Sequence, residues 1–230
     1  MLIATDKNWD AHVGDAEEIA RGAGFQALRE RIVELAAPAA GEVAVDVGAG
    51  TGLLSLELAS RGLEVWAIDI SPSMCEYLRS KAASAEADRL RIGVGSAASL
   101  PLMDGVADLV VSNYCFHHLP DEGKRRALAE ARRVLAPGGR LVFGDMMFAL
   151  GLSEPRDREV VITKVRAIAR KGPAGFVRLG RNAARIATRR WEHPARAEWW
   201  RQALLDAGFV DVEVELFHHE GGVASARAPR

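Results

Sequence analysis

A glycine-rich stretch between an apolar run and a helical pattern is the strongest chemical signal in the sequence. It reads VDVGAGTGLLSLELA over residues 45–59, with glycines at the alternate positions Gly48, Gly50 and Gly52. Glycine adopts positive φ at little cost and lets a ligand approach the main chain closely. In open α/β sheets, such a strand-to-helix turn is where nucleotide-like ligands bind. A tight turn without a ligand has the same composition, so the glycines alone do not decide.

A carboxylate in the next apolar run narrows the choice of ligand. Asp69 ends that run, 21 positions after Gly48, where it can accept hydrogen bonds from both hydroxyls of a ribose. Dinucleotides and simpler nucleosides both carry this diol. A dinucleotide fingerprint needs Gly-x-Gly-x-x-Gly, but Leu53 occupies the place of its last glycine. The spacing therefore favours a nucleoside cofactor over the rival hypothesis, a nicotinamide-dependent oxidoreductase on a similar sheet.

Two adjacent histidines, His117 and His118, follow another apolar run and are candidates for proton transfer. An imidazole exchanges a proton readily near neutral pH, so either one could act as a general base. The structural alternative is that one of them bonds main chain at the start of a helix. His193 and Asp145 are further candidates for lining a substrate pocket. No His-x-x-x-His or Cys-x-x-Cys spacing occurs, so the sequence predicts no metal site.

The elements that must position these residues alternate along the chain. Apolar strand-like runs cover residues 42–47, 63–70, 89–95, 106–116 and 140–147, with helical patterns between them. The last of these helices should be stopped by Pro137-Gly138-Gly139. A final helix over 197–208 precedes runs at 209–217 and 221–228, which no long crossover separates. We therefore predict a three-layer, doubly wound α/β fold with a seven-stranded, mostly parallel sheet, a C-terminal antiparallel hairpin at one edge and an inserted helical lid.

Length and composition indicate the domain organisation and the class of protein. A length of 230 residues and a hydrophobic content of 49% indicate a single domain over 1–230. We expect its residues 1–40 to form an N-terminal helical cap. The net charge of −1 gives no sign of nucleic-acid binding. Cys75 and Cys115 have no spacing typical of a disulfide framework. The sequence shows no apolar leader typical of a signal peptide, and no run of the roughly 18 apolar residues that a membrane span needs. We therefore expect a cytoplasmic protein with reduced thiols, and its oligomeric state stays open.

The predicted lid, residues 155–193, is strongly basic. It holds eleven Lys and Arg residues against three acidic ones, a net charge of +8. Two helices joined at GPAG would form it. Its arginines could simply be solvated. They could also bind an anionic substrate, or place an amphipathic helix on an anionic membrane surface, which would be a peripheral contact. RNA is the least supported partner, because no aromatic residues interleave with the charges.

Five motifs taken together resemble one family. They are VDVGAGTG, AIDIS, GSAASLPL, DLVVSNYCFHHL and RVLAPGGRLV. In this order they resemble the class I S-adenosylmethionine-dependent methyltransferases, closest to the small-molecule branch that includes the quinone-biosynthesis C-methyltransferases. The resemblance covers residues 43–145 well and the final helix and hairpin loosely. It implies S-adenosyl-L-methionine as the cofactor and says almost nothing about the methyl acceptor.

The resemblance also implies a set of cofactor-binding residues. Asp69 would take the ribose diol, and Asn113 would sit at the methionyl end. Trp9 would close over the cofactor, although packing a helix onto the sheet would explain it equally well. Ser96 departs from the family pattern, which often has Asp there, so this adenine contact would be weaker by roughly 1 kcal/mol. The full set is Trp9, Asp46, Gly48, Ala49, Gly50, Gly52, Asp69, Ile70, Ser96, Ala97 and Asn113.

The predicted function is therefore enzymatic. A methyl group would pass from S-adenosylmethionine to a small hydrophobic or anionic acceptor by in-line displacement, with His117 and His118 as the catalytic candidates. Such a displacement depends mainly on alignment, and a general base is optional. Two alternatives remain at this point. The acceptor could be a lipid or lipid-like molecule at an anionic membrane surface, or the protein could bind the cofactor without turning it over.

Overall fold

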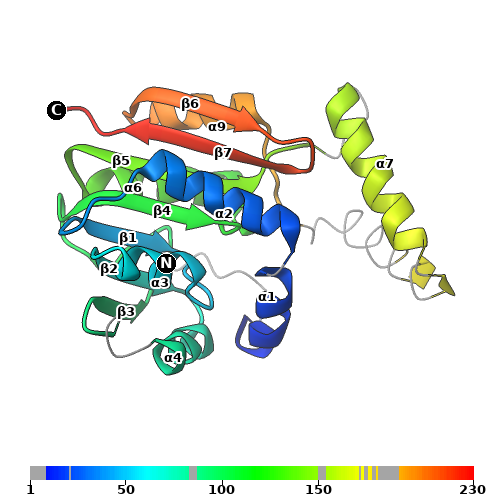
Figure 1. The fold of residues 1–230 in the computed structure, drawn as a ribbon. Coiled ribbons are helices and arrows are strands. Elements are labelled where there is room, and N and C mark those ends of the chain that lie inside the picture. Colours follow the sequence, from blue (N-terminus) through cyan, green and yellow to red (C-terminus); the bar gives the residue numbers. More distant parts are fainter. Residues whose placement is uncertain are drawn as a thin grey trace.

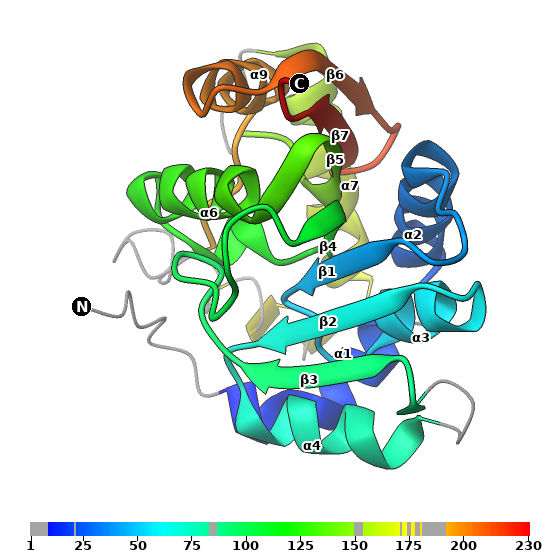
Figure 2. The ribbon, with the colours of Figure 1, turned by 90° about the vertical axis from the view of Figure 1, so that its left-hand side faces the viewer.

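The computed structural model describes residues 9–20, 22–82, 87–149, 154–170, 172–173, 176–177, 180 and 192–230. Its centre is a seven-stranded sheet in the order β3-β2-β1-β4-β5-β7-β6, with helices on both faces (Figures 1 and 2). β7 runs antiparallel to both of its neighbours, β5 and β6, and the other neighbouring strands are parallel. The predicted fold class is thereby confirmed, including the hairpin at one edge.

The strands owe their composition to their place in the sheet. Central strands are buried on both faces, which explains why their sequences are continuous apolar runs; Val45, Val110 and Leu141 are fully buried. The edge strand β6 reads VDVEVEL and alternates instead. The bounds are β1 Val43–Val47, β2 Glu64–Asp69, β3 Leu90–Val94, β4 Ala107–Asn113, β5 Leu135–Met146, β6 Val210–Leu216 and β7 Gly221–Arg227.

Two buried apolar clusters join the helices to the sheet. On one face, α2 and α3 pack around Leu28, Ile32 and Leu58, and on the other, α6 and α9 pack around Leu128 and Trp200 (Figure 2). The helices are η1 Trp9–His12, α1 Val13–Ala20, α2 Ala23–Ala36, α3 Leu53–Ser60, α4 Pro72–Lys81, η2 Phe116–His118, α6 Asp121–Val134, α7 Pro155–Ala169 and α9 Ala197–Asp206. None of these is long and apolar enough to cross a bilayer.

The start of β5 differs from the sequence-based prediction. We expected Pro137-Gly138-Gly139 to stop the preceding helix and the strand to begin at Arg140. Instead, α6 ends at Val134 and β5 begins at Leu135, which pairs with Ala107 of β4. Four residues of β5 then lie opposite a single residue of β4, and Gly138 has a φ of +79°. The glycine pair therefore forms a bulge within the strand and not a loop before it.

The N-terminal helices contact the rest of the fold at two places, the start of α4 and the sheet. Asp10 accepts hydrogen bonds from the Ser71 hydroxyl (2.5 Å) and the Ser73 main-chain N–H (3.1 Å), at the start of α4. Helix α2 packs against β4, β5 and β7, so this part of residues 1–40 belongs to the helical layer of the sheet. Asp10 therefore holds the neighbouring Trp9 at the carboxyl edge of the strands.

The inserted segment begins with a helix, as predicted. Helix α7 stands away from the sheet in Figure 1. Asp157, in its first turn, forms an ion pair with Arg196 just before α9, at 3.2 Å, so the two ends of the insertion lie side by side. Arg156 anchors the same turn through hydrogen bonds of 2.8–3.1 Å to the main-chain oxygens of Met147, Phe217, His219 and Gly221. The helix predicted over 176–190, including its arginines, lies outside the described residues except for Phe176, Val177 and Gly180.

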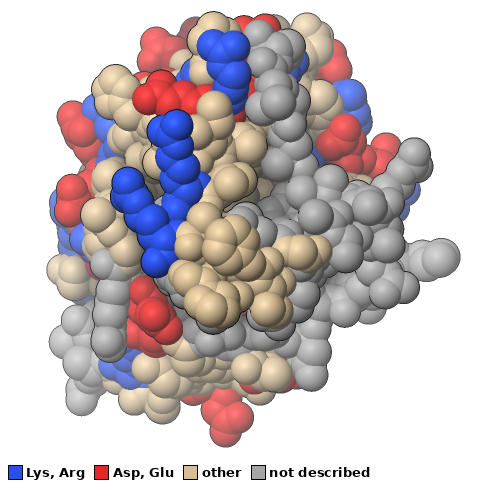
Figure 3. Space-filling view, turned by 90° about the vertical axis from the view of Figure 1, so that its right-hand side faces the viewer, with Lys and Arg blue, Asp and Glu red and all other residues tan. Residues whose placement is uncertain are grey.

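The surface of α7 mixes charge with apolar side chains. Figure 3 looks onto this side of the molecule and shows Lys and Arg atoms beside an uncharged area. Ile162 and Val165 are exposed on the helix, as are the neighbouring Arg158 and Arg166. Helix α7 therefore carries basic and apolar side chains on its surface, while the amphipathic helix predicted over 176–190 and the partner of the lid remain predictions.

Candidate functional site

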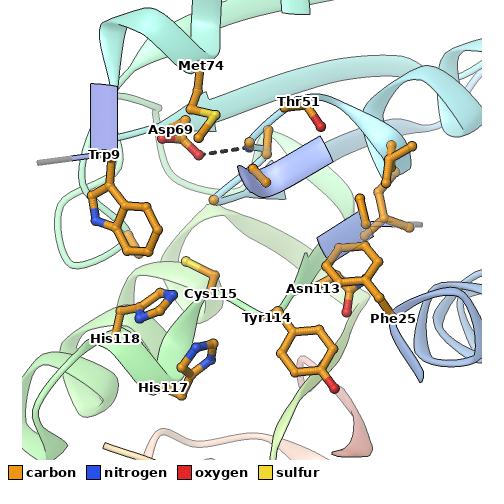
Figure 4. Close-up of a pocket in the computed structure, with 18 of the residues that line it drawn as sticks. Trp9, Phe25, Thr51, Asp69, Met74, Asn113, Tyr114, Cys115, His117 and His118 are labelled. Atoms are coloured by element: carbon orange, nitrogen blue, oxygen red, sulfur yellow. Dashed lines mark hydrogen bonds between the residues drawn. The ribbon is translucent and has the colours of Figure 1, made fainter. Parts of the chain in front are cut away.

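A cavity of about 910 Å³ opens at the carboxyl ends of β1, β2 and β4, and we call it the main cavity (Figure 4). Its volume falls in the range of small-molecule sites. The sheet topology brings together here turns that lie far apart in the sequence. The lining includes these predicted residues: Trp9, Asp46, Gly48, Ala49, Gly50, Asp69, Ile70, Ser96, Ala97, Asn113, His117 and His118. Three of the residues that the sequence offered do not line it, namely Gly52, Asp145 and His193.

The three glycines of the first turn share positive φ but have different surroundings. A Cβ on Gly48 would lie 2.3 Å from the Cys115 sulfur. The close packing of this residue against the turn that follows β4 therefore requires a glycine. A Cβ on Gly50 would meet nothing within 4 Å, although this residue lines the main cavity. Gly50 therefore leaves open space where a ligand could lie against the main chain.

Gly52 is required by the packing of the fold and does not line the main cavity. Its φ is +86°, and a Cβ there would lie 2.0 Å from a methyl group of buried Leu78. We expect Gly52→Val to lower the free energy of unfolding by about 1–3 kcal/mol more than Gly41→Val does. Gly41 is a matched control, since its φ of +88° is similar and a Cβ there meets nothing. Urea denaturation of both variants measures the difference, and equal destabilisation would show that Leu78 makes room.

Asp69 is held rigidly at the wall of the main cavity. Its Oδ2 accepts from the Gly50 N–H (2.8 Å) and its Oδ1 from the Ser71 N–H (2.9 Å). Burial raises the pKa of this carboxyl, and the main-chain hydrogen bonds oppose the rise. Each oxygen keeps a second lone pair, so both can still accept from a vicinal diol. The geometry therefore suits the role that the sequence predicted.

Asp46 lies deeper, behind the glycine turn. It is buried at the end of β1 and accepts a hydrogen bond from the Ser55 hydroxyl at 2.6 Å. Burial raises its pKa to about 7, and the nearby negative charge of Asp69 adds to the effect. A cationic group of a ligand in the cavity would favour ionised Asp46.

Asn113 carries an unused hydrogen-bonding group. Both polar atoms of its side-chain amide are buried, and neither has a hydrogen-bond partner in the described part of the chain. Leaving such a group unpaired costs roughly 1–3 kcal/mol. Asn113 lines the main cavity, so a ligand bearing both donors and acceptors, such as an amino acid, would satisfy it. Together with the open space at Gly50, this fits the predicted cofactor.

Ser96 already makes one hydrogen bond. It is buried, and its Oγ accepts from the Ala98 N–H at 3.2 Å. A second lone pair and the hydroxyl proton remain available for a base edge. Ile70, beside Asp69, is 36% exposed and presents an apolar surface to the cavity.

The two histidines differ in their surroundings. His117 is 3% exposed, and its Nδ1 lies 2.5 Å from Oδ1 of the fully buried Asp145. His118 packs its ring against Trp9, with centroids 4.4 Å apart, and against His117 at 3.8 Å. Asp145 does not line the cavity and supports His117 from behind. His193 also lies outside the lining, and its main-chain N–H donates to the His117 carbonyl at 2.6 Å.

One possible set of metal ligands was not visible in the sequence spacing. His117, His118 and Glu192 each place one donor atom so that all three lie within 4.8 Å of one another. Donors around a tetrahedral zinc ion lie about 3.4 Å apart, given bonds of about 2.1 Å. A gap of up to 4.8 Å would have to close for these three to share an ion.

Sequence reasoning missed an aromatic part of the lining. Phe25 of α2 stacks on Tyr114 with centroids 5.3 Å apart, and Tyr114 meets His117 edge-on at 5.9 Å. Burial raises the pKa of the Tyr114 hydroxyl strongly, so it stays neutral. Tyr114 follows Asn113 directly and could have been found from its place at a strand end. Nothing local to Phe25 marks it as part of a site.

The lining is acidic. Among the described residues it holds the carboxylates of Asp46, Asp69, Glu192 and Glu220, and it contains no Lys or Arg. No Lys or Arg in this part of the chain is therefore placed to neutralise an anionic ligand.

Comparisons with known proteins agree on one family. A family model described as a methyltransferase domain matches residues 45–143. An uncharacterized methyltransferase of Geobacillus thermodenitrificans is 36% identical over 143 residues, which are 62% of this chain and 61% of that protein. A malonyl-[acyl-carrier protein] O-methyltransferase of Geobacter sulfurreducens is 36% identical over 208 residues, 88% of this chain and 69% of that protein.

A solved structure shows the same fold. It is a phosphoethanolamine N-methyltransferase of Haemonchus contortus in complex with S-adenosyl-L-methionine, with a TM-score of 0.71. The likeness covers all of this chain and 61% of that one, at 17% sequence identity.

Proposed function

We infer that this chain, which belongs to the family of S-adenosylmethionine-dependent methyltransferases, transfers a methyl group to a small molecule bound in the main cavity. The observation that carries this proposal is that both histidines and all of the predicted cofactor residues except Gly52 line the same cavity. The cofactor supplies a methyl group that is already activated on a sulfonium. The protein's task is therefore mainly to align the two reactants and exclude water.

The residues of the cavity would divide this task. Asp69 and the Gly50 turn would hold the ribose, and the unpaired amide of Asn113 would bind the amino acid end. Tyr114, His117 and His118 lie across the cavity from Asp69 in Figure 4. That side would receive the acceptor.

The lining favours one of the two predicted acceptor classes. Its aromatic rings and carboxylates suit a hydrophobic or amine-bearing molecule better than an anionic one. The names of similar proteins do not identify which acceptor atom receives the methyl group, since one is named as an O-methyltransferase and another as an N-methyltransferase. The lipid alternative depends on lid arginines that lie outside the described residues.

A labelling experiment tests the proposal. The protein is incubated with methyl-labelled S-adenosylmethionine and a metabolite extract, and small-molecule products are separated by mass spectrometry. We expect a new labelled product with wild type, and its loss with Asp69→Ala at a cofactor concentration that saturates wild type. Cofactor binding without any transfer of label would instead support the non-catalytic alternative.

A further inference from the structure

We propose that Asp145 is a positioning residue that fixes His117 as a proton acceptor toward the main cavity. The methyl acceptor would then be a molecule whose attacked atom carries a proton, either a hydroxyl or an N–H group. The proposal rests on the proposed function and names its substrate class. It also separates His117 from His118, which the sequence left equivalent.

The contacts of Asp145 hold it in one orientation. Its Oδ1 lies 2.5 Å from His117 Nδ1 and accepts from the Met146 N–H at 2.7 Å, while its Oδ2 accepts from the main-chain N–H of His117 at 2.9 Å. Two main-chain donors fix the carboxylate as an acceptor, so the proton shared with the ring lies on Nδ1. The other ring nitrogen, Nε2, then carries the lone pair.

The position of His117 places that lone pair where it can accept a proton from a molecule in the main cavity. The ring lines the main cavity between Tyr114 and His118. In the described part of the chain, Nε2 has no hydrogen-bond partner, whereas Nδ1 is committed to Asp145. A base oriented by a buried carboxylate is the arrangement that proton abstraction needs. His118 is placed differently, with its ring against Trp9.

The proposed step moves one proton to His117 and one methyl group to the acceptor. His117 Nε2 takes the proton of the acceptor's O–H or N–H group while that oxygen or nitrogen forms its bond to the methyl carbon. The carbon–sulfur bond breaks, its electron pair stays on sulfur, and a neutral thioether leaves. Asp145 stabilises the imidazolium, which later returns the proton to water. No oxidant, metal or further reactant is required.

Imidazole nitrogen NMR tests the positioning role directly. The chain has six histidines, and His117→Gln identifies the His117 signals by their loss. We expect a protonated Nδ1 and an unprotonated Nε2 in wild type, and loss of this pattern in Asp145→Asn. Asp108→Asn is the matched control, because Asp108 also accepts from a main-chain N–H, that of Val43, but does not contact a histidine. The opposite tautomer in wild type, or an unchanged pattern in Asp145→Asn, would overturn the proposal.

The labelling experiment tests the substrate class. A protic acceptor exchanges a hydrogen for a methyl group and keeps its charge, whereas a thioether or tertiary amine gains a fixed positive charge. We expect products of the first kind, with the rate at saturating substrate at least about 100-fold lower in Asp145→Asn. A permanently cationic product would overturn the class. So would activity that EDTA abolishes and zinc restores, since His117 would then be a metal ligand with His118 and Glu192.

Calorimetry with S-adenosylmethionine on the same samples separates the two proposals. We expect Asp145→Asn to bind within about threefold of wild type, because Asp145 lies behind His117 and does not line the cavity. No binding by wild type would refute the proposed function. Normal binding with the wrong tautomer would refute only the role of Asp145.

Discussion

Asp69→Ala should weaken S-adenosylmethionine binding by at least about 30-fold, or roughly 2 kcal/mol. We assign the half-buried Asp69 carboxylate to the ribose diol, and each of its oxygens is already oriented by a main-chain N–H. Removing it would leave the two ligand hydroxyls without their charged acceptor on the protein. Isothermal calorimetry on wild type and variant measures the loss.

The same substitution also removes two hydrogen bonds of the fold, so a second variant is needed. Asp69→Asn keeps the size of the side chain and one acceptor oxygen, and we expect an intermediate loss of affinity. Circular dichroism checks that both variants are folded. Wild-type affinity in folded Asp69→Ala would show that the cofactor lies elsewhere.

Gly50→Val should abolish measurable cofactor binding, a loss of roughly 100-fold or more, in a protein that still folds. A Cβ at this position meets no protein atom, so the new side chain would occupy open space on the cavity wall. The N–H that binds Asp69 is retained. The positive φ of +53° adds strain of roughly 1–3 kcal/mol to the folded state.

Gly41→Val controls for that strain, because Gly41 also has positive φ and no neighbour within 4 Å, but it does not line the main cavity. We expect it to lose similar stability and to bind S-adenosylmethionine normally. Normal binding by Gly50→Val would contradict the placement of the ligand against this turn.

Local sequence predicted those parts of the site that lie within one motif. The Gly48–Gly52 turn follows β1, Asp69 ends β2, and the two histidines lie a few residues beyond the end of β4. Parallel strands bring their carboxyl ends to one edge of the sheet. The sequence could not distinguish Gly50 from Gly52. Both adopt positive φ, and only the packed position of Leu78 shows that Gly52 serves the fold.

Contacts between distant elements explain what sequence reasoning missed. Phe25 reaches the cavity because α2 packs across the sheet, and Glu220 because of where the final hairpin turns. The pairing of Asp145 with His117 depends on the register between β4 and β5, which places Asn113 opposite Gly144. The early start of β5 had the same origin, since pairing with Ala107 extended the strand through a proline and two glycines.

The most direct test of the proposed methyl transfer is parallel calorimetric titration of the purified protein with S-adenosylmethionine, S-adenosylhomocysteine and NADH. We expect the first two to bind, with this binding abolished in Gly50→Val, and we expect no binding of NADH. Binding of NADH alone would contradict the assignment of the Gly48–Gly52 turn and with it the proposed methyl transfer.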